Sequence, residues 1–188
     1  MKLSDEATSW PHQRIATTSG ILMDFVVDEV TAPDGAVLVR NYLQHPSAVG
    51  VIAVDDQERV AIVRQYRHPV RRRCIEAPAG LCDQVGEDPL EAAKRELAEE
   101  CGLAANDWRM LVDIYATPGS STQSTRIFLA RGLRAVAAPE GFSPEGEEAE
   151  MIVAWAGVDD LLEAIFSGNI MNPTLVSGLL AYKYTQLS

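Results

Sequence analysis

Residues 78–103 constrain the fold of this chain more than any other part of the sequence. They predict a loop that leads into a helix with defined ends. Asp88 is a favourable N-cap, Pro89 suits the first helical position, and Glu91 stands where it can complete a capping box. Gly102 stands where helices commonly end in a left-handed residue. The predicted helix has about three and a half turns at 3.6 residues per turn.

One face of this helix carries a cluster of carboxylates. Glu96 and Glu100 are four residues apart and therefore stand one above the other, with Glu99 alongside. Glu87 adds another carboxylate upstream. Like charges at this spacing cost a helix a few tenths of a kcal/mol, whereas clustered hard oxygen ligands suit Mg²⁺ or Mn²⁺. A solvated acidic helix face is the alternative, and periodicity alone leaves both interpretations open.

The order of residues along the helix resembles a known motif. Residues 95–103 are similar to the second half of the Nudix box, and Glu87, with seven residues between it and Arg95, fits its middle. Gly80 fits its start, although this chain has six residues between Gly80 and Glu87 where the family has five. We interpret Val85 or a neighbour as a one-residue insertion in the loop. The insertion precedes the helix and leaves the carboxylate spacing unchanged.

A dense basic run, residues 67–73, precedes the box in a protein that is acidic as a whole. One interpretation is a charged surface loop. The other is a cradle for phosphate or for an acidic neighbouring subunit, because arginine offers a two-pronged donor to phosphate oxygens. We favour the second because the run leads directly into residues 76–80 and the box. His68 could ligate a metal, but a single histidine without a partner is more often a loop or packing residue.

Together, residues 65–80 and the box resemble the ADP-ribose pyrophosphatase branch of the Nudix hydrolases, and the similarity extends from Ala48 to the C-terminus. The resemblance implies an α/β fold, an α/β/α sandwich with a mixed sheet, whereas periodicity alone does not fix the strand order. It also implies a homodimer whose N-terminal β hairpins are exchanged. The implied cofactor is Mg²⁺, with Mn²⁺ as the alternative.

The resemblance also implies roles for single residues. Glu96 and Glu100 match the metal-binding carboxylates, and Ala79 matches the residue whose carbonyl joins the metal. Arg95 matches the arginine that orients these carboxylates, and Arg67 matches the arginine that contacts phosphate. The expected site comprises the metal ligands Ala79, Glu96, Glu99 and Glu100, the catalytic residues Arg95, Glu99, Glu100 and Gln123, and the substrate-binding residues Arg67, Arg72, Glu76 and Gly80.

Gln123 is the main departure from the family pattern. It falls in the loop 117–123, where the family carries a Glu that acts as general base or as an extra metal ligand. A carboxamide cannot take a proton from water at neutral pH, although it can orient a water or bind a hydroxyl.

Three explanations for Gln123 remain open. The base could lie elsewhere, at Glu99 or in the acidic loop 145–148, with the metal lowering the pKa of water. The substrate could differ from ADP-ribose. The protein could also be a weak enzyme that mainly binds its ligand.

Composition and charge exclude several classes of protein. The chain has 188 residues, of which 47% are hydrophobic and 23% charged, as in soluble globular domains. Its formal net charge of −11 argues against nucleic-acid binding, which needs a basic surface. No apolar run is long enough to span a bilayer and no secretory leader is visible, so we expect no membrane partner. Three cysteines without metal spacing favour a cytoplasmic location.

The chain divides into three predicted regions. Residues 1–19 are polar and are expected to form a flexible lead-in. Residues 20–46 predict a β hairpin with a turn at 32–35, which must pack on the main domain or on a partner subunit because an isolated hairpin is marginally stable. Residues 47–188 form the expected Nudix domain.

Within residues 47–188, the pattern predicts strands and C-terminal helices around the box. The elements are a second hairpin of strands 48–54 and 60–66, strands 108–116, 124–131 and 151–156, and helices at 159–166 and from 173 onward. Asp159 is the expected cap of the first of these helices, and Trp155 is expected in the core. Residues 134–150 are acidic and form either a lid over the substrate or a solvated loop.

These features predict hydrolysis of a diphosphate linkage in a nucleoside diphosphate joined to another group. ADP-ribose, cleaved to AMP and ribose 5-phosphate, is the first expectation, and other nucleotide sugars are the alternative substrates. A ligand-binding sensor with a Nudix fold is the alternative of another class. No DNA-binding appendage is visible in the sequence, which weakens the sensor hypothesis.

Overall fold

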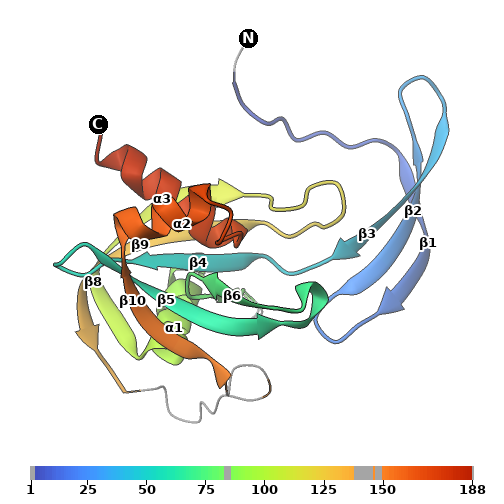
Figure 1. Cartoon of the computed structure of the whole chain (residues 1–188). Coiled ribbons are helices and arrows are strands. Elements are labelled where there is room, and N and C mark those ends of the chain that lie inside the picture. Colours follow the sequence, from blue (N-terminus) through green and yellow to red (C-terminus); the bar gives the residue numbers. More distant parts are fainter. Residues whose placement is uncertain (1–2, 83–85, 138–145, 147–149, 188) are drawn as a thin grey trace. The chain divides into compact units, whose positions relative to one another are not determined.

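The computed structural model describes residues 3–82, 86–137, 146 and 150–187. The chain forms two compact units (Figure 1). The smaller unit comprises Met1–Pro46 with Thr117–Gln123, and the larger comprises Ser47–Ala116 with Ser124–Ser188. Among the described residues, no helix is long and apolar enough to cross a membrane.

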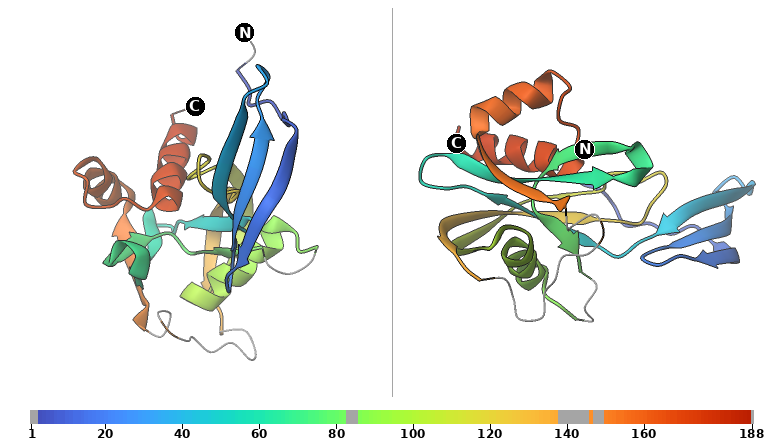
Figure 2. Two further views of the ribbon diagram at one scale, coloured as in Figure 1. Left: turned by 90° about the vertical axis from the view of Figure 1, so that its right-hand side faces the viewer. Right: turned by 60° about the horizontal axis from the view of Figure 1, so that its bottom comes forward.

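The smaller unit is built on a three-stranded antiparallel sheet (Figure 2). Its strands, in spatial order, are β1 (His12–Ser19), β2 (Asp24–Thr31) and β3 (Val37–Gln44). The predicted turn between β2 and β3 forms, with Gly35 at a φ of 86° and its N–H donating to the Ala32 carbonyl at 2.9 Å.

The flexible lead-in expected for residues 1–19 is wrong for β1, which pairs with β2 from His12 to Ser19. All eight side chains of β1 are exposed, so this strand is held by backbone hydrogen bonds to β2 together with the ion pair between Arg14 and Asp28. A strand held in this way needs no alternation of apolar and polar residues, which explains why the sequence pattern did not predict β1. The expected hairpin is therefore two strands of a three-stranded sheet.

The described residues of the larger unit form two sheets and three α-helices. The mixed sheet has the order β7 (Ala79–Leu81), β4 (Ala48–Ala53), β9 (Thr125–Ala135) and β8 (Leu103–Ile114), with β4 and β9 parallel. The antiparallel sheet has the order β10 (Ile152–Gly157), β5 (Arg59–Arg67) and β6 (Arg72–Glu76). A short 3₁₀ turn, η1 (His68–Val70), joins β5 to β6, and the helices are α1 (Pro89–Cys101), α2 (Val158–Phe166) and α3 (Pro173–Thr185).

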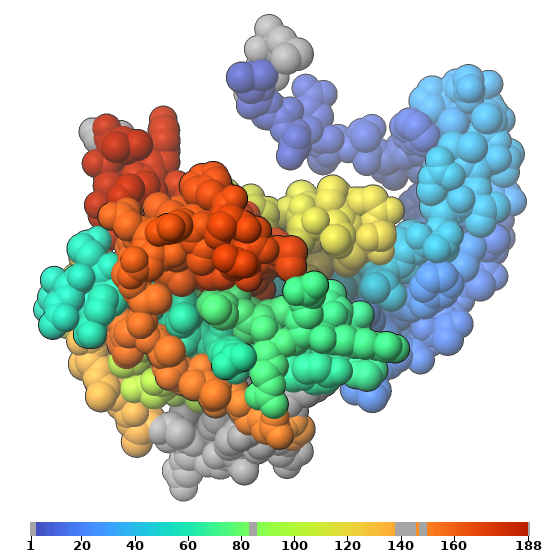
Figure 3. All heavy atoms as spheres, viewed as in Figure 1, coloured from blue at the N-terminus to red at the C-terminus, as the bar shows by residue number. Residues whose placement is uncertain are grey.

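Alternate residues of β4 show how the layers stack, because successive side chains of a strand point to opposite faces. Ile52 belongs to a buried cluster with Leu175 and Leu179 of α3. Val51 belongs to a second buried cluster with Leu97 of α1. The mixed sheet is thus covered by α1 on one face and by α3 on the other, which confirms the predicted sandwich. Figure 3 shows α2 and α3, coloured orange to red, gathered on one face of this unit.

The predicted second hairpin is wrong, because β4 and β5 lie in different sheets. Within the described part of the chain they meet at one isolated bridge, between Val54 and Val60. Both strands are apolar and buried along most of their length. The two strands therefore separate and bury their faces in different layers, which a pattern of local turns cannot reveal.

Two expectations near the C-terminus also need correction. Trp155 lies on β10 with 38% of its surface exposed, and its ring contacts the Arg59 guanidinium at 5.6 Å instead of filling the core. The residue that caps α2 is Gly157, and Asp159 lies inside the helix, where it pairs with Lys183. The helix predicted from 173 onward begins there, and Asn172 caps it, because its side chain accepts a hydrogen bond from the Leu175 N–H at 2.8 Å.

Candidate active site

Helix α1 begins and ends where its sequence predicts. The Asp88 carboxylate accepts a hydrogen bond from the Leu90 N–H at 2.8 Å, and Pro89 is the first helical residue. Gly102 ends the helix at a φ of 62°. Glu91 accepts a hydrogen bond from Lys94 at 2.7 Å, so its carboxylate is used along the helix and not in the predicted capping box.

The carboxylates of α1 lie against the backbone of β7. The Ala79 N–H donates to Glu100 Oε2 at 2.9 Å. A Cβ added to Gly80 would lie 2.0 Å from the carboxyl carbon of Glu96, so this close approach requires glycine. The structure therefore brings Ala79 and Gly80 of β7 next to Glu100 and Glu96, two of the three predicted metal-binding carboxylates.

Arg95 cross-links the remaining carboxylates. Its Nε donates to Glu87 at 3.1 Å, and its Nη1 donates to Glu96 at 2.6 Å and to Glu99 at 3.2 Å. Its Nη2 donates to the Leu81 carbonyl at 3.2 Å. Hydrogen bonds to Glu87, with the charge of Glu96, raise the pKa of Arg95 above its ordinary value. One guanidinium thus holds three carboxylates and the loop that faces them.

Arg67 and Glu76 form a second ion pair near the box. Arg67 donates two hydrogen bonds to Glu76, from Nε at 3.1 Å and from Nη2 at 2.8 Å, and Glu76 is 4% exposed. Hydrogen bonding to Glu76 is the main cause that raises the pKa of Arg67, and the charge of Glu100 adds to it. The predicted phosphate-binding arginine is therefore fixed in orientation and lies within electrostatic range of the box.

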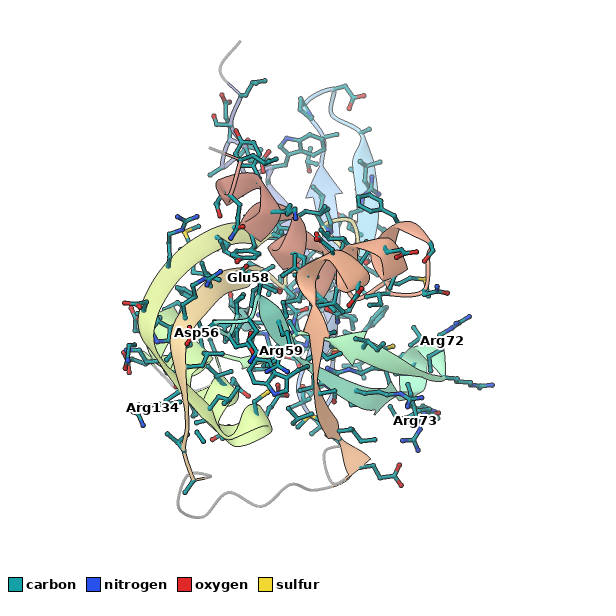
Figure 4. The ribbon with its side chains drawn as sticks, turned by 60° about the vertical axis from the view of Figure 1, so that its left-hand side comes forward. Asp56, Glu58, Arg59, Arg72, Arg73 and Arg134 are labelled. Atoms are coloured by element: carbon teal, nitrogen blue, oxygen red, sulfur yellow. The ribbon has the colours of Figure 1, made fainter. Side chains whose placement is uncertain are left out.

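Arg72 and Arg73 begin β6, at the opposite end of β5 from Glu58 (Figure 4). Both are exposed, and Arg73 pairs with Glu150 at 2.8 Å. Arg71, just before them, adopts a left-handed φ of 52° that turns the chain into β6. The role assigned to Arg72 in substrate binding stays a prediction.

Gln123 lies in the smaller unit. Its Nε2 is 2.9 Å from Nδ1 of His45, a residue of the same unit that the sequence analysis did not assign to the site. Other expected features, Val85 and the acidic residues Glu145, Glu147 and Glu148, fall outside the described residues.

The donor set matches a hard divalent cation, because carboxylates and backbone carbonyls are the ligands such ions prefer. Among the described residues, no group of three or more His, Cys, Asp or Glu side chains meets the geometry needed to hold a metal ion. Three of the box carboxylates, those of Glu87, Glu96 and Glu99, are hydrogen-bonded to Arg95. Burial, with the charge of Glu100, raises the pKa of Cys101 to about 12, so this thiol stays neutral beside the carboxylates.

The helix, its carboxylates and the mixed sheet define a Nudix hydrolase fold, and comparison with known proteins agrees. The NUDIX domain family model matches residues 44–172, so the chain belongs to the Nudix family. Divalent metal ions are general cofactors of this family.

Individual proteins of known activity or structure are also similar to this chain. The chain is 42% identical to an ADP-ribose pyrophosphatase of Mycobacterium tuberculosis over 154 residues, 82% of this chain and 73% of the relative. It is 37% identical to an ADP-ribose pyrophosphatase of Bacillus subtilis over 115 residues, 61% of this chain and 62% of the relative. A crystal structure of an ADP compounds hydrolase matches with a TM-score of 0.76, covering 95% of this chain and 96% of that one; its 21% identity makes it evidence for the fold alone.

Proposed function

We propose that this protein is a Mg²⁺-dependent pyrophosphohydrolase that cleaves the diphosphate of ADP-ribose to AMP and ribose 5-phosphate. The observation that carries the proposal is the convergence of Glu96 and Glu100 on the backbone of Ala79 and Gly80. The two relatives described above, both ADP-ribose pyrophosphatases, support the choice of substrate.

Four residues would hold the metal: Glu96, Glu99 and Glu100 through their carboxylates, and Ala79 through its carbonyl. When bound, Mg²⁺ neutralises diphosphate oxygens and lowers the pKa of an attacking water. The Ala79 N–H fixes the Glu100 carboxylate. Arg95 keeps the box carboxylates together, and two of those that it contacts, Glu96 and Glu99, are among the residues that would hold the ion.

In this proposal Arg67 binds the diphosphate of the substrate, and the backbone at Gly80 approaches the substrate closely. Because Glu76 holds the guanidinium by two hydrogen bonds, Arg67 presents its charge in one orientation to the diphosphate. Glu76 would also line the substrate side of the site. Gln123 would bind a hydroxyl or orient a water, and Glu99 is our first choice of base.

A substrate panel with Mg²⁺ and with EDTA tests the proposal. It contains ADP-ribose, several nucleotide sugars, dinucleoside polyphosphates and coenzyme A, each scored by the nucleotide released. We expect AMP from ADP-ribose and its loss with EDTA. Turnover of another nucleotide sugar without ADP-ribose would make Gln123 a mark of changed specificity, and binding without turnover would support a sensor.

We also propose a homodimer that forms through the smaller unit. Phe25 and Leu43 are paired across β2 and β3 and are both exposed, and Val37 and Val39 share the exposed face of β3 with Leu43. An exposed apolar face of this kind suits a second copy of the chain. Sedimentation of the wild type against Phe25→Glu tests it, and equal masses would refute it. The cytoplasmic location stays a prediction.

A further inference from the structure

The loop 117–123 is hydrogen-bonded to the end of β3. The Leu43 N–H donates to the Ser120 carbonyl at 2.9 Å, and the Thr122 N–H donates back to the Leu43 carbonyl at 3.0 Å. The His45 N–H donates to Thr122 Oγ1 at 2.9 Å, and this hydroxyl donates to the His45 carbonyl at 3.2 Å. These bonds fix the backbone on both sides of the contact between His45 and Gln123.

The imidazole of His45 has two close neighbours at the same nitrogen. Nδ1 lies 2.8 Å from the Pro46 carbonyl oxygen and 2.9 Å from the terminal amide of Gln123. A carbonyl oxygen can only accept a hydrogen bond, so the first contact requires a proton on Nδ1. An unprotonated Nδ1 would set two lone pairs against each other at 2.8 Å.

A proton on Nδ1 decides the orientation of the Gln123 amide. The nitrogen and oxygen of a carboxamide exchange places by a half-turn, and the hydrogen-bond partners select between the two orientations. With Nδ1 as donor, the oxygen turns toward His45 and shares the proton with the Pro46 carbonyl. The NH₂ group then faces away from His45.

We infer that His45 is a positioning residue that turns Gln123 into a hydrogen-bond donor for an oxygen of the substrate. This inference rests on the proposed function, in which Gln123 contacts the substrate. An amide N–H matches a diphosphate oxygen or a ribose hydroxyl, whereas it cannot receive the proton of an attacking water. The base is then a residue other than Gln123. The same Nδ1–H would also hold a glutamate at position 123.

The tautomer of His45 tests the inference without any turnover. The sequence holds three histidines, His12, His45 and His68, so long-range ¹H–¹⁵N spectra of the labelled full-length chain are readily assigned with His45→Asn. We expect His45 to carry its proton on Nδ1. A neutral His45 protonated on Nε2 alone would overturn the inference. Because this readout needs no substrate, it remains decisive even if ADP-ribose is not hydrolysed.

Kinetics test whether His45 acts through Gln123. We expect His45→Phe to lower kcat/KM for ADP-ribose about tenfold and His45→Asn, whose amide N–H can replace Nδ1–H, to retain most of the activity. His12→Phe, at an exposed position of β1, is the matched control and should stay within about twofold.

A double-mutant cycle completes the test. In a Gln123→Ala background, His45→Phe should cause no further loss, because the side chain that His45 orients is already gone. A second tenfold loss in that background would overturn the inference. Absence of ADP-ribose turnover in the wild type would instead contradict the proposed function, and the tautomer would still decide the role of His45.

Discussion

The described residues of the larger unit include two clusters in which carboxylates meet arginine. They differ in the ratio of carboxylates to hydrogen-bond donors. In the box, one guanidinium, that of Arg95, serves Glu87, Glu96 and Glu99, with Glu100 on the next turn. Glu58 lies at the turn between β4 and β5 (Figure 4). Its single carboxylate accepts hydrogen bonds from Arg131 and from the Tyr182 hydroxyl, the latter at 2.5 Å. The first cluster has carboxylates in excess and the second has donors in excess.

This difference distinguishes the box, which we propose as a metal site, from the Glu58 cluster, which has a structural role. Carboxylates in excess of cations carry a net negative charge that a further cation can neutralise. In the second cluster, which we call the Tyr182 tie, Arg131 of β9 and Tyr182 of α3 hold Glu58, and Gln186 donates to the Tyr182 hydroxyl at 2.6 Å. Glu58 has a φ of 57°, so the tie also holds a strained turn residue in place.

The largest expected effect comes from removing one box carboxylate. Glu100→Gln keeps the shape of the side chain but removes the charge that would hold the metal. A bound divalent ion contributes several kcal/mol of charge stabilisation, so we expect kcat/KM to fall by about 10³-fold or more at ordinary Mg²⁺. Glu58→Gln in the Tyr182 tie is the matched control and should retain activity. Intact turnover in Glu100→Gln would show that the proposed metal site is wrong.

Gly80→Ala tests the close packing of the box against β7. The added methyl group would meet the Glu96 carboxyl carbon at 2.0 Å, so this side chain has to move. We expect a loss of about 10- to 100-fold in kcat/KM, by analogy with misoriented metal ligands, together with a higher Mg²⁺ requirement. A Mg²⁺ titration of initial rates measures both. An unchanged Mg²⁺ requirement would mean that Glu96 does not bind the ion.

Local rules predicted the box well and the sheets poorly, for a physical reason. The ends of α1 depend on Asp88, Pro89 and Gly102, and the stacking of its carboxylates depends on helix geometry, all within one short segment. The separation of β4 from β5 and the presence of β1 depend on partners far away in the sequence. His45 and Gln123 are 78 positions apart, so no local pattern could have paired them.

Gln123→Glu asks whether one more carboxylate in this chain can act as a base. A glutamate would lose the amide donor, but it would accept the His45 Nδ1–H with one oxygen and keep the other for a proton. Because a general base contributes about 10²- to 10⁴-fold, we expect the gain to exceed the loss and turnover of ADP-ribose to rise by about tenfold. The gain should shrink in a His45→Phe background. Steady-state rates of the wild type, the two single variants and the double variant measure this. No change, or a fall, would place the base elsewhere and would mean that position 123 does not correspond to the glutamate of the family pattern.

The smallest expected effect concerns the Tyr182 tie. Tyr182 is 2% exposed, and Tyr182→Phe removes its hydrogen bond to Glu58, so we expect a loss of about 1 kcal/mol in the free energy of unfolding with activity retained. Urea denaturation measures the loss, and Tyr184→Phe, at an exposed position, is the matched control.

The pH dependence of that loss distinguishes hydrogen bonding from packing. The hydrogen bond from Tyr182, followed by that from Arg131, lowers the pKa of Glu58 from its ordinary value of 4.5. A carboxylate with a lowered pKa stabilises the fold above its unfolded pKa, and this contribution is lost as the pH falls through the folded pKa. The deficit of Tyr182→Phe should therefore be complete at pH 7 and shrink below about pH 4.5. A deficit that is constant across this range would assign the loss of stability to packing of the ring. The Tyr182 tie would then depend on packing, and its contrast with the box would not rest on the ratio of carboxylates to donors alone.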